Sequence, residues 1–244
     1  MSSTDGTHRP VPDDRLSAGK RRRTTKSGTT LSQELIVRTA IRLLGQHGNE
    51  ALTVRRLGTA LGADPSAIYR YFRNADDLVL AVADELIGMS LRGLALTGRW
   101  RTDIENIGLE LHRTYVAHPQ AAVLAASRVT RRPNEMKGVE AGLRVLRGAG
   151  FAAADAARHY HAFIDFTLGF AAIDAAAAAL PPAVAAADRA AWEATYARLP
   201  ADEFPHIAAS VDELALTMSD SAYPRALRLF LDGLAAALPA VGPG

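Results

Sequence analysis

The segment TVRRLGTALGADPSAIYRYF, at residues 53–72, constrains the fold of this 244-residue chain more than any other. Thr53 is a favoured helix cap, Gly62 permits the left-handed turn that ends a helix, and Pro65 suits the first turn of the next helix. The apolar residues between the cap and the turn recur at helical spacing: Val54, Leu57 and Leu61. We therefore expect a helix-turn-helix unit whose second helix, from Pro65 to Phe72, lies in the major groove of DNA.

Spacing along this second helix divides its side chains between two faces. Ile68 and Phe72 lie four residues apart and share a face with Pro65, so we expect these three to pack on their own domain. The other side chains would face DNA, where serine, alanine and arginine read base edges, and hydroxyl groups and helix N-termini bind phosphates. The residues expected to contact DNA are Thr53, Arg55, Ser66, Ala67, Tyr69, Arg70 and Tyr71. For the two tyrosines, a role as core aromatics stays open.

The charge of the chain is unevenly distributed. Through Arg73 there are 13 Lys or Arg against 6 Asp or Glu, a balance of +7, whereas the remainder has 15 against 20, a balance of −5. A basic end on an acidic body is typical of a nucleic-acid-binding protein with a second task. Residues 1–28 include the basic run of residues 20–26 and lack hydrophobic periodicity, which predicts a disordered basic arm. A tail that only aids solubility is the alternative.

The rest of the chain predicts an all-α fold. Thr30 or Ser32 would begin the first helix, Gly48 would end it, and Asn74 with Asp77 would cap the helix after Phe72. Later helices are expected at 102–117, 120–130, 135–148, 153–179, 184–198, 206–218 and 223–238. We expect three parts: the arm at 1–28, a three-helix DNA-binding domain at 29–75, and a helical ligand-binding and dimerisation domain at 76–240.

Several classes of site and location are disfavoured. The chain has no cysteine, so disulfides and thiolate metal sites are excluded. No unbroken apolar run reaches the length of a membrane span, and the N-terminus lacks the apolar segment of a signal peptide. Histidines occur without metalloprotease spacing, and no glycine-rich phosphate loop is present. We expect a cytoplasmic protein that is not an enzyme, has no cofactor or metal, and does not bind membranes.

Three segments resemble known repressors. Residues 31–86, with LTVRRLGTALGADPSAIYRYFRNADDL, resemble the N-terminal domain of TetR-family transcriptional repressors. Residues 150–174, GFAAADAARHYHAFIDFTLGFAAID, are similar to the long eighth helix of the tetracycline-repressor branch, and ALRLFLDGLAAAL at 226–238 is similar to its last helix. The resemblance implies a homodimer that binds a palindromic double-stranded DNA operator and a small organic inducer.

The resemblance also implies how the dimer forms. Helices 153–179 and 223–238 would build a four-helix bundle with a second copy of the chain. An apolar stripe on the last helix agrees with this: Leu227, Phe230, Leu231, Leu234 and Leu238. The alternative is that the stripe belongs to the core of the single chain. In one respect the DNA-binding end departs from the family, because Ala75 stands where most members carry a lysine that touches a phosphate.

The ligand site is expected by resemblance to have lost its metal. The family position that ligates magnesium falls on Arg128, and that of a glutamate linked to the ion falls on Ile173. The expected ligand-binding residues are Leu91, Ile107, Leu111, Arg128, Phe166, Phe170 and Ile173. Since an arginine cannot ligate a cation, this pocket suits a hydrophobic or anionic organic molecule rather than a metal–tetracycline chelate.

Two other functions stay open at this point. A regulator of the same fold could take no small molecule and answer to a protein partner. An enzyme or carrier on a helical scaffold is the third class. The sequence names neither the ligand nor the operator.

Overall fold

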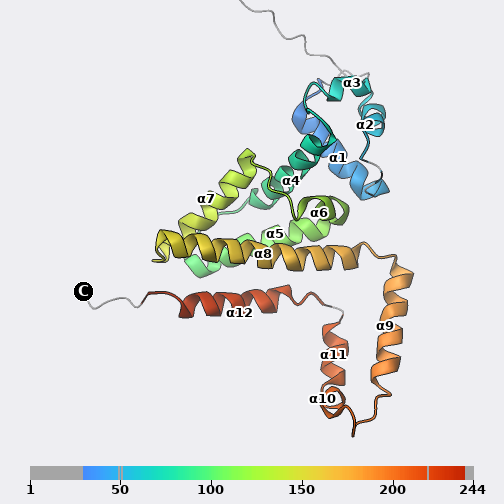
Figure 1. The fold of residues 1–244 in the computed structure, drawn as a ribbon, viewed down its shortest axis with the longest axis vertical. Coiled ribbons are helices and arrows are strands. Elements are labelled where there is room, and N and C mark those ends of the chain that lie inside the picture. The colour runs from blue at the N-terminus through green and yellow to red at the C-terminus, as the bar shows by residue number, and fades with distance from the viewer. Residues whose placement is uncertain (1–29, 49, 51, 219, 240–244) are drawn as a thin grey trace, which may run out of the picture.

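The computed structural model describes residues 30–48, 50, 52–218 and 220–239, and the predicted basic arm at 1–28 lies outside them. Throughout the described residues the chain is helical and contains no β-strand, as the sequence predicts. The helices are α1 (Gln33–His47), α2 (Val54–Leu61), α3 (Pro65–Ile68), α4 (Ala75–Leu91), α5 (Trp100–Ala117), α6 (Pro119–Ala125), α7 (Pro133–Gly148), α8 (Ala153–Ala178), α9 (Pro182–Tyr196), α10 (Pro205–Ala208), α11 (Val211–Thr217) and α12 (Tyr223–Ala236). Helices α1–α3 form one end of the molecule, and α4 joins them to a body of α5–α8 and α12 (Figure 1).

Local capping explains where the first helices begin. Ser32 caps α1 by accepting the Leu35 N–H at 3.1 Å, so of the two expected starts Ser32 is correct. Thr53 caps α2 in the same way, as predicted. The Asn74 side chain caps α4 by accepting the Asp77 N–H at 2.8 Å, again as predicted. Each cap satisfies a backbone donor that would otherwise have no partner in the helix.

Three predicted helices are shorter or broken in the structure. The expected helix 65–72 is helical only as α3, because the bonds Arg70 N–H to Ala67 O and Tyr71 N–H to Ile68 O span three residues and tighten the chain into a turn. The expected helix 120–130 ends as α6, and a loop at residues 126–132 follows. The expected helix 206–218 is divided into α10 and α11.

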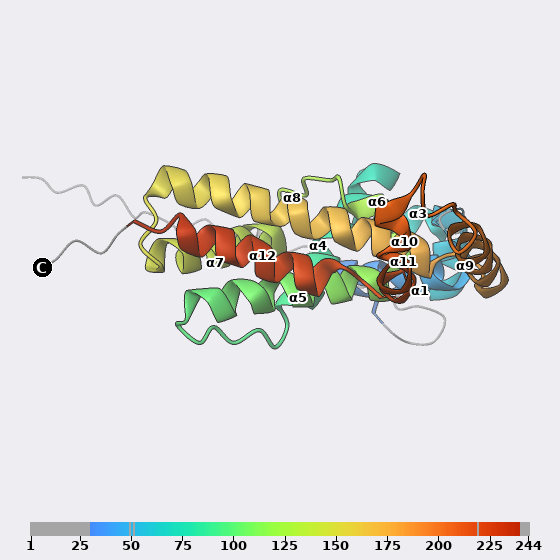
Figure 2. The ribbon, with the colours of Figure 1, turned by 90° about the horizontal axis from the view of Figure 1, so that it is seen from below.

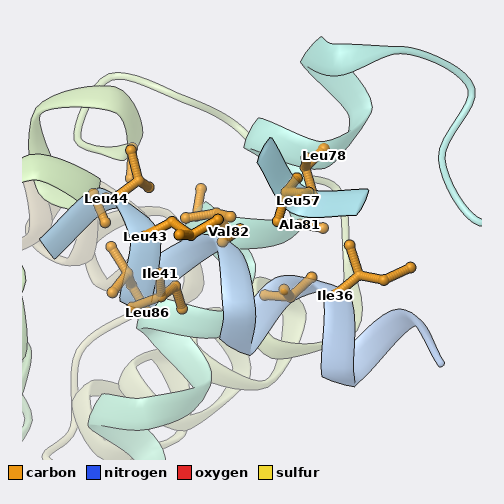
Figure 3. Close-up of a cluster of buried hydrophobic side chains, with 14 of the residues drawn as sticks. Ile36, Ile41, Leu43, Leu44, Leu57, Leu78, Ala81, Val82 and Leu86 are labelled. Atoms are coloured by element: carbon orange, nitrogen blue, oxygen red, sulfur yellow. The ribbon is translucent and has the colours of Figure 1, made fainter. Parts of the chain in front are cut away.

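A first hydrophobic core joins the α1–α3 end to the body. Its buried members from α1, α2 and α4 pack together at the centre of this end, as Figure 3 shows. They include Ile36, Leu44, Leu57, Val82 and Leu86, each fully buried. The same cluster continues into α5, α6 and α8. Because α4 contributes to both parts of this core, a displacement of α4 in the body must disturb the packing of α1–α3.

A second core contains buried residues of α5, α7, α8 and α12, and it holds α12 against α5 and α8, with Tyr223 fully buried in it. The buried Tyr223 hydroxyl is 2.9 Å from the Thr167 hydroxyl. The His112 ring stacks on Tyr223 with ring centroids 4.4 Å apart, and its Nε2 lies 2.7 Å from an Asp174 carboxylate oxygen. These polar contacts attach the start of α12 to α5 and α8, which lie alongside it in Figure 2.

The apolar stripe of α12 packs in or against the core of the single chain. Leu227, Leu231 and Leu234 are buried within the single chain, so for these three the single-chain core is the correct interpretation. On the outer side of α12, Leu229 is 63% exposed. Helices α9–α11 extend from the end of α8 away from α1–α3, and none of their residues is buried (Figure 1).

Helix α8 is long and apolar enough, by length and composition, to cross a membrane. Its place in the fold gives another reason for that composition. It packs against α5, α6, α7 and α12, and 22% of its most apolar 18-residue stretch is buried in the single chain.

Candidate functional site

The turn between α2 and α3 fixes the angle at which α3 leaves its domain. Gly62 adopts the left-handed conformation, with φ 59° and ψ 33°, as the sequence predicts. A Cβ on Gly58 would lie 2.9 Å from the Ala63 carbonyl oxygen and 3.1 Å from Pro65, so only glycine lets the start of α3 come this close to α2. The Asp64 carboxylate accepts the Ser66 N–H at 2.8 Å and caps α3. These contacts give α3 a defined orientation.

The side chains of α3 and the following turn divide between core and solvent largely as expected. Ile68 and Phe72 are 1% and 2% exposed, whereas Ser66 and Arg70 are exposed and Tyr69 is 54% exposed. The core aromatic alternative is therefore wrong for Tyr69.

Two expected orientations on α3 are wrong. Ala67 was expected to face DNA but is buried beside Ile68, because the turn after Asp64 directs both side chains toward α2. Pro65 was expected in the core but is exposed.

Tyr71 has an intermediate position. Its hydroxyl donates a 2.6 Å hydrogen bond to the Leu31 carbonyl oxygen, which anchors the chain segment before α1 to the turn after α3. The ring remains 37% exposed. Tyr71 can thus accept a hydrogen bond from solvent or a ligand, but its proton is already donated within the protein.

The predicted phosphate-binding residues at the start of α2 are accessible to solvent. Thr53 and Arg55 are both exposed. The Thr53 oxygen accepts the Arg56 N–H at 3.2 Å, which leaves the hydroxyl proton free in direction to donate. Positive helix-dipole charge at this N-terminus adds to the attraction of an anion.

The start of α4 is acidic and is held by two arginines of the 126–132 loop. Arg128 donates to the Asp76 carboxylate at 2.6 Å, and Arg132 donates to the Asp77 carboxylate at the same distance. A hydrogen bond from the Arg73 backbone N–H holds the pKa of Asp77 below its ordinary value, and burial opposes this while the Arg132 charge adds to it. The loop thus attaches to the helix that follows the DNA-binding unit.

A cavity of about 330 Å³ lies among α4, α5, α7 and α8, and the 126–132 loop forms part of its wall. Four of the seven expected ligand-binding residues line it: Leu91, Ile107, Leu111 and Arg128. The volume is at the small end of the range for sites that hold organic ligands. Among the described residues, no three His, Asp or Glu side chains gather as a metal site would require.

The other three expected residues lie away from this cavity. Phe166 stacks on Phe230 of α12 with ring centroids 5.1 Å apart, and Phe170 packs 5.7 Å from the Tyr223 ring. Ile173 is 69% exposed. On a helix these three positions face α12 and solvent, whereas Ile164 and Leu168 of the same helix face the cavity.

Sequence reasoning missed three polar residues that line the cavity together, Tyr115, Glu135 and Tyr160, and it also missed Ser90, Ser127, His161 and Asp165. Burial, with a smaller contribution from the negative charge of Glu135, raises the pKa of both tyrosines to about 12. A signal for Tyr115 existed, because Ile107, Leu111 and Tyr115 follow one another at four-residue spacing on one face of α5. Nothing comparable marks Glu135 or Tyr160.

The wall formed by the 126–132 loop is held by a buried carboxylate of α4. Asp84 accepts the Glu135 N–H at 2.9 Å and the Thr130 hydroxyl at 3.2 Å. Glu135 in turn accepts the Thr130 hydroxyl at 3.0 Å and the Arg131 N–H. Arg131 has a positive φ of 56°, which side chains rarely adopt and which this network holds in place.

Two protein families match the chain. Residues 36–82 match the family described as bacterial regulatory proteins, tetR family, and residues 94–238 match the tetracyclin repressor-like C-terminal domain. Tetracycline repressor protein class C of Escherichia coli is 33% identical over 143 residues, which are 57% of this chain and 64% of that protein. An HTH-type transcriptional regulator of Saccharopolyspora erythraea is 31% identical over 57% of this chain and 59% of its own length. These two relatives are thus matched over less than two thirds of their length.

Solved structures extend the likeness over most of the chain. Apo ActR from Streptomyces coelicolor has a TM-score of 0.73 and 27% identity, covering 84% of this chain and 95% of that one. ActR in complex with actinorhodin has a TM-score of 0.76 and 26% identity, covering 87% and 99%. Because the second family match alone covers more than half of the chain, the family is established. The chain belongs to the TetR family of bacterial regulatory proteins, with a C-terminal domain of the tetracycline-repressor type.

Proposed function

We propose that this chain is a sequence-specific transcriptional repressor that a small organic ligand releases from a palindromic DNA operator. The observation that carries the proposal is that Ser66, Tyr69 and Arg70 are all exposed on a helix-turn-helix unit whose turn is held by defined contacts. Ser66 and Arg70 would read base edges, and Arg70 can pair with both acceptors of a guanine. Tyr69, Thr53 and Arg55 would bind phosphates.

The proposed repressor acts as a homodimer. Helices α8 and α12 lie side by side and carry exposed apolar residues on their outer faces, with Ile173 and Leu229 each more than 60% exposed. Pairing these faces with a second copy would bury them in a four-helix bundle. A two-fold dimer places its recognition helices about 34–36 Å apart, which matches successive major grooves of B-DNA.

Release would pass from the cavity to α4 through the 126–132 loop. Arg128 lines the cavity and also pairs with Asp76 at the start of α4, and Asp84 in the middle of α4 holds the same loop. A ligand that changes the position of this loop therefore moves α4 and, through the shared core, α1–α3. The ligand lowers DNA affinity only by its own preference for the released state.

The proposed ligand is not a metal–tetracycline chelate. By the resemblance, Arg128 occupies the position of a metal-binding histidine, and a guanidinium group has no lone pair with which to ligate a metal ion. ActR has been solved with actinorhodin, which supports control by an organic molecule at this kind of C-terminal domain. We place the repressor in the cytoplasm and assign it no enzymatic activity.

Two measurements test this function. Fluorescence anisotropy with labelled DNA from upstream of the chain's own gene should show specific binding that unlabelled random DNA does not displace. Failure to bind any such duplex, with the dimer intact, would contradict the proposal. Tetracycline with magnesium should leave the melting temperature unchanged, and a large stabilisation would overturn the exclusion of the chelate.

A further inference from the structure

One face of α7 brings a carboxylate into the wall of the cavity. Glu135, Gly138 and Val139 all line the cavity, and Gly142 continues the same helix face. A Cβ on Gly142 would lie 2.4 Å from the Tyr160 ring, so the glycine lets this ring lie directly against α7. The Tyr160 side chain is thereby held within reach of the charge of Glu135.

Tyr115, on α5, adds a second phenol to the polar corner of the cavity, which is the part lined by Glu135 and Tyr160. The residue is only 2% exposed, yet its hydroxyl has no hydrogen-bond partner among the described residues and is open to the cavity. Among the described residues no buried side-chain oxygen or nitrogen lacks a partner, so this hydroxyl is accessible to water from the cavity, and a ligand atom can take the place of that water. The raised pKa values keep both phenols protonated, so each can donate or accept a hydrogen bond.

The electrostatic balance of this corner is negative. In the part of the chain that the structure describes, Glu135 forms no ion pair, and both of its hydrogen bonds go to one carboxylate oxygen. The buried carboxylate of Asp84 lies behind it and accepts the Glu135 N–H.

The basic side chains that line the cavity each lie against another carboxylate. Arg128 is directed to Asp76 at 2.6 Å. At the rim, His161 lies 3.4 Å from Asp165, and both side chains are mostly exposed. An anionic ligand group entering the corner would therefore meet a like charge in a site of low dielectric constant.

We infer that the cavity binds an apolar organic molecule that carries a hydrogen-bond donor, either a neutral hydroxyl or an ammonium group, and that it excludes carboxylates. The donor binds the open oxygen of Glu135, the phenols of Tyr115 and Tyr160 complete the polar corner, and the apolar body lies against Leu91, Ile107 and Leu111. This ligand class rests on the proposed function, since it takes the cavity as the effector site. It replaces the sequence-based expectation of an anionic ligand.

A matched set of fluorescent probes tests the ligand class on the full-length protein without DNA. Pyrenemethanol, pyrenemethylamine, pyrenecarboxylic acid and methylpyrene share one polycyclic body and differ in the polar group. Titrations followed by emission anisotropy should show the alcohol and the amine binding at least about tenfold more tightly than the carboxylate. Equal or tighter binding of the carboxylate overturns the inference, and so does a failure of both the alcohol and the amine to bind.

Variants then test whether Glu135 and Tyr115 cause the preference for the alcohol and the amine over the carboxylate. Glu135→Gln removes the charge but keeps an acceptor, so the carboxylate should gain about tenfold in affinity. Glu140→Gln is the matched control, because Glu140 is an exposed residue of the same helix outside the cavity, and it should change nothing. Tyr115→Phe should weaken the alcohol by about fivefold and leave methylpyrene unchanged. A carboxylate affinity that Glu135→Gln leaves unaltered contradicts the assignment.

Operator binding, measured on the same preparations, distinguishes a failure of the ligand class from a failure of the repressor function. Intact DNA binding together with carboxylate preference overturns the ligand class and leaves the repressor function standing. Absence of all specific DNA binding by the wild-type protein contradicts the repressor function, whichever probe the cavity prefers.

Discussion

The two candidate sites of this chain are built in opposite ways. At the DNA-binding end the functional side chains are exposed, and a short stretch of backbone from α2 to α3 holds them through the Gly62 turn, the Asp64 cap and the buried Ala67, Ile68 and Phe72. In the cavity the functional side chains are buried or partly buried and come from four helices and a loop. A short local motif is enough to hold DNA-contacting side chains in a fixed orientation, whereas a pocket forms only when segments distant in sequence pack together.

The largest effect is expected from removing a single exposed side chain at the DNA-binding end. Arg70→Ala should weaken operator binding by about 2–6 kcal/mol, since two bidentate guanine pairs of roughly 1–3 kcal/mol each are removed from a dimer. The melting temperature should stay near that of the wild type, because Arg70 is exposed. Anisotropy titrations against the operator measure the weakening.

Arg144→Ala is the charge-matched control for this test. Arg144 is exposed on α7 and pairs with Glu140 at 3.6 Å, far along the chain from the DNA-binding unit. If the two variants bind operator equally well, Arg70 does not read DNA.

The next variant tests whether the backbone of the α2–α3 turn orients the exposed side chains of α3 for DNA binding. Gly58→Ala adds a Cβ that would lie 2.9 Å from the Ala63 carbonyl oxygen, so the α2–α3 turn must shift. We expect a decrease of about 1–3 kcal/mol in the free energy of unfolding and weaker operator binding, although Gly58 is buried and cannot touch DNA. Urea denaturation and anisotropy measure the two effects.

Gly45→Ala provides the comparison within the same domain. Gly45 lies in α1 with no atom near its missing Cβ, and alanine there should stabilise the helix by about 0.5–1 kcal/mol. A neutral result for Gly58→Ala would show that the turn is not rigid.

A smaller effect is expected from the basic arm. Deleting residues 1–28 should weaken operator affinity by about tenfold, and the slope of log K against log salt should flatten by about 0.9 for each phosphate that the arm neutralises in the intact protein. The arm would compensate for the lysine that Ala75 replaces. An unchanged slope would show that the arm does not contact DNA.

The contrast between the two sites explains what the sequence could predict. The helix-turn-helix depends on neighbours in sequence, so Thr53, Gly62 and the exposed Arg70 followed from local rules. Even there Ala67 was misplaced, because the turn after Asp64 sets how α3 is rotated against α2, and residue spacing does not show this rotation. In the cavity, Leu91 and Ile107 were found by resemblance.

The missed features of the cavity depend on tertiary packing. Glu135 faces the cavity only because Asp84, fifty-one residues earlier, fixes the start of α7. Phe166 and Phe170 pack between α8 and α12, and not in the cavity, because their rings contact Tyr223 at the start of α12. No spacing along the chain marks either relationship.

The last effect concerns stability alone and not operator binding, and it compares two carboxylates that anchor loops at the two ends. At the DNA-binding end, Asp77 has its pKa lowered from 3.8 chiefly by the Arg73 N–H. In the body, burial pushes the pKa of Asp103 upward, but hydrogen bonds from Thr97 and Gly98 outweigh it and the net shift is also downward. Both groups stabilise the fold fully above their unfolded-state pKa, and this stability is lost as pH falls through the folded-state pKa.

Asparagine variants isolate the two contributions. Asp77→Asn and Asp103→Asn should each cost about 1–3 kcal/mol near neutral pH, and each difference from the wild type should shrink as the pH falls below about 4. Asp103 should show the larger cost, because its carboxylate accepts three hydrogen bonds, from the Thr97 N–H, the Thr97 hydroxyl and the Gly98 N–H. Urea denaturation between pH 3 and 7 measures both. A cost that stays constant with pH would mean that shape, and not charge, makes these residues necessary, and the two ends of the molecule would then be anchored by packing alone.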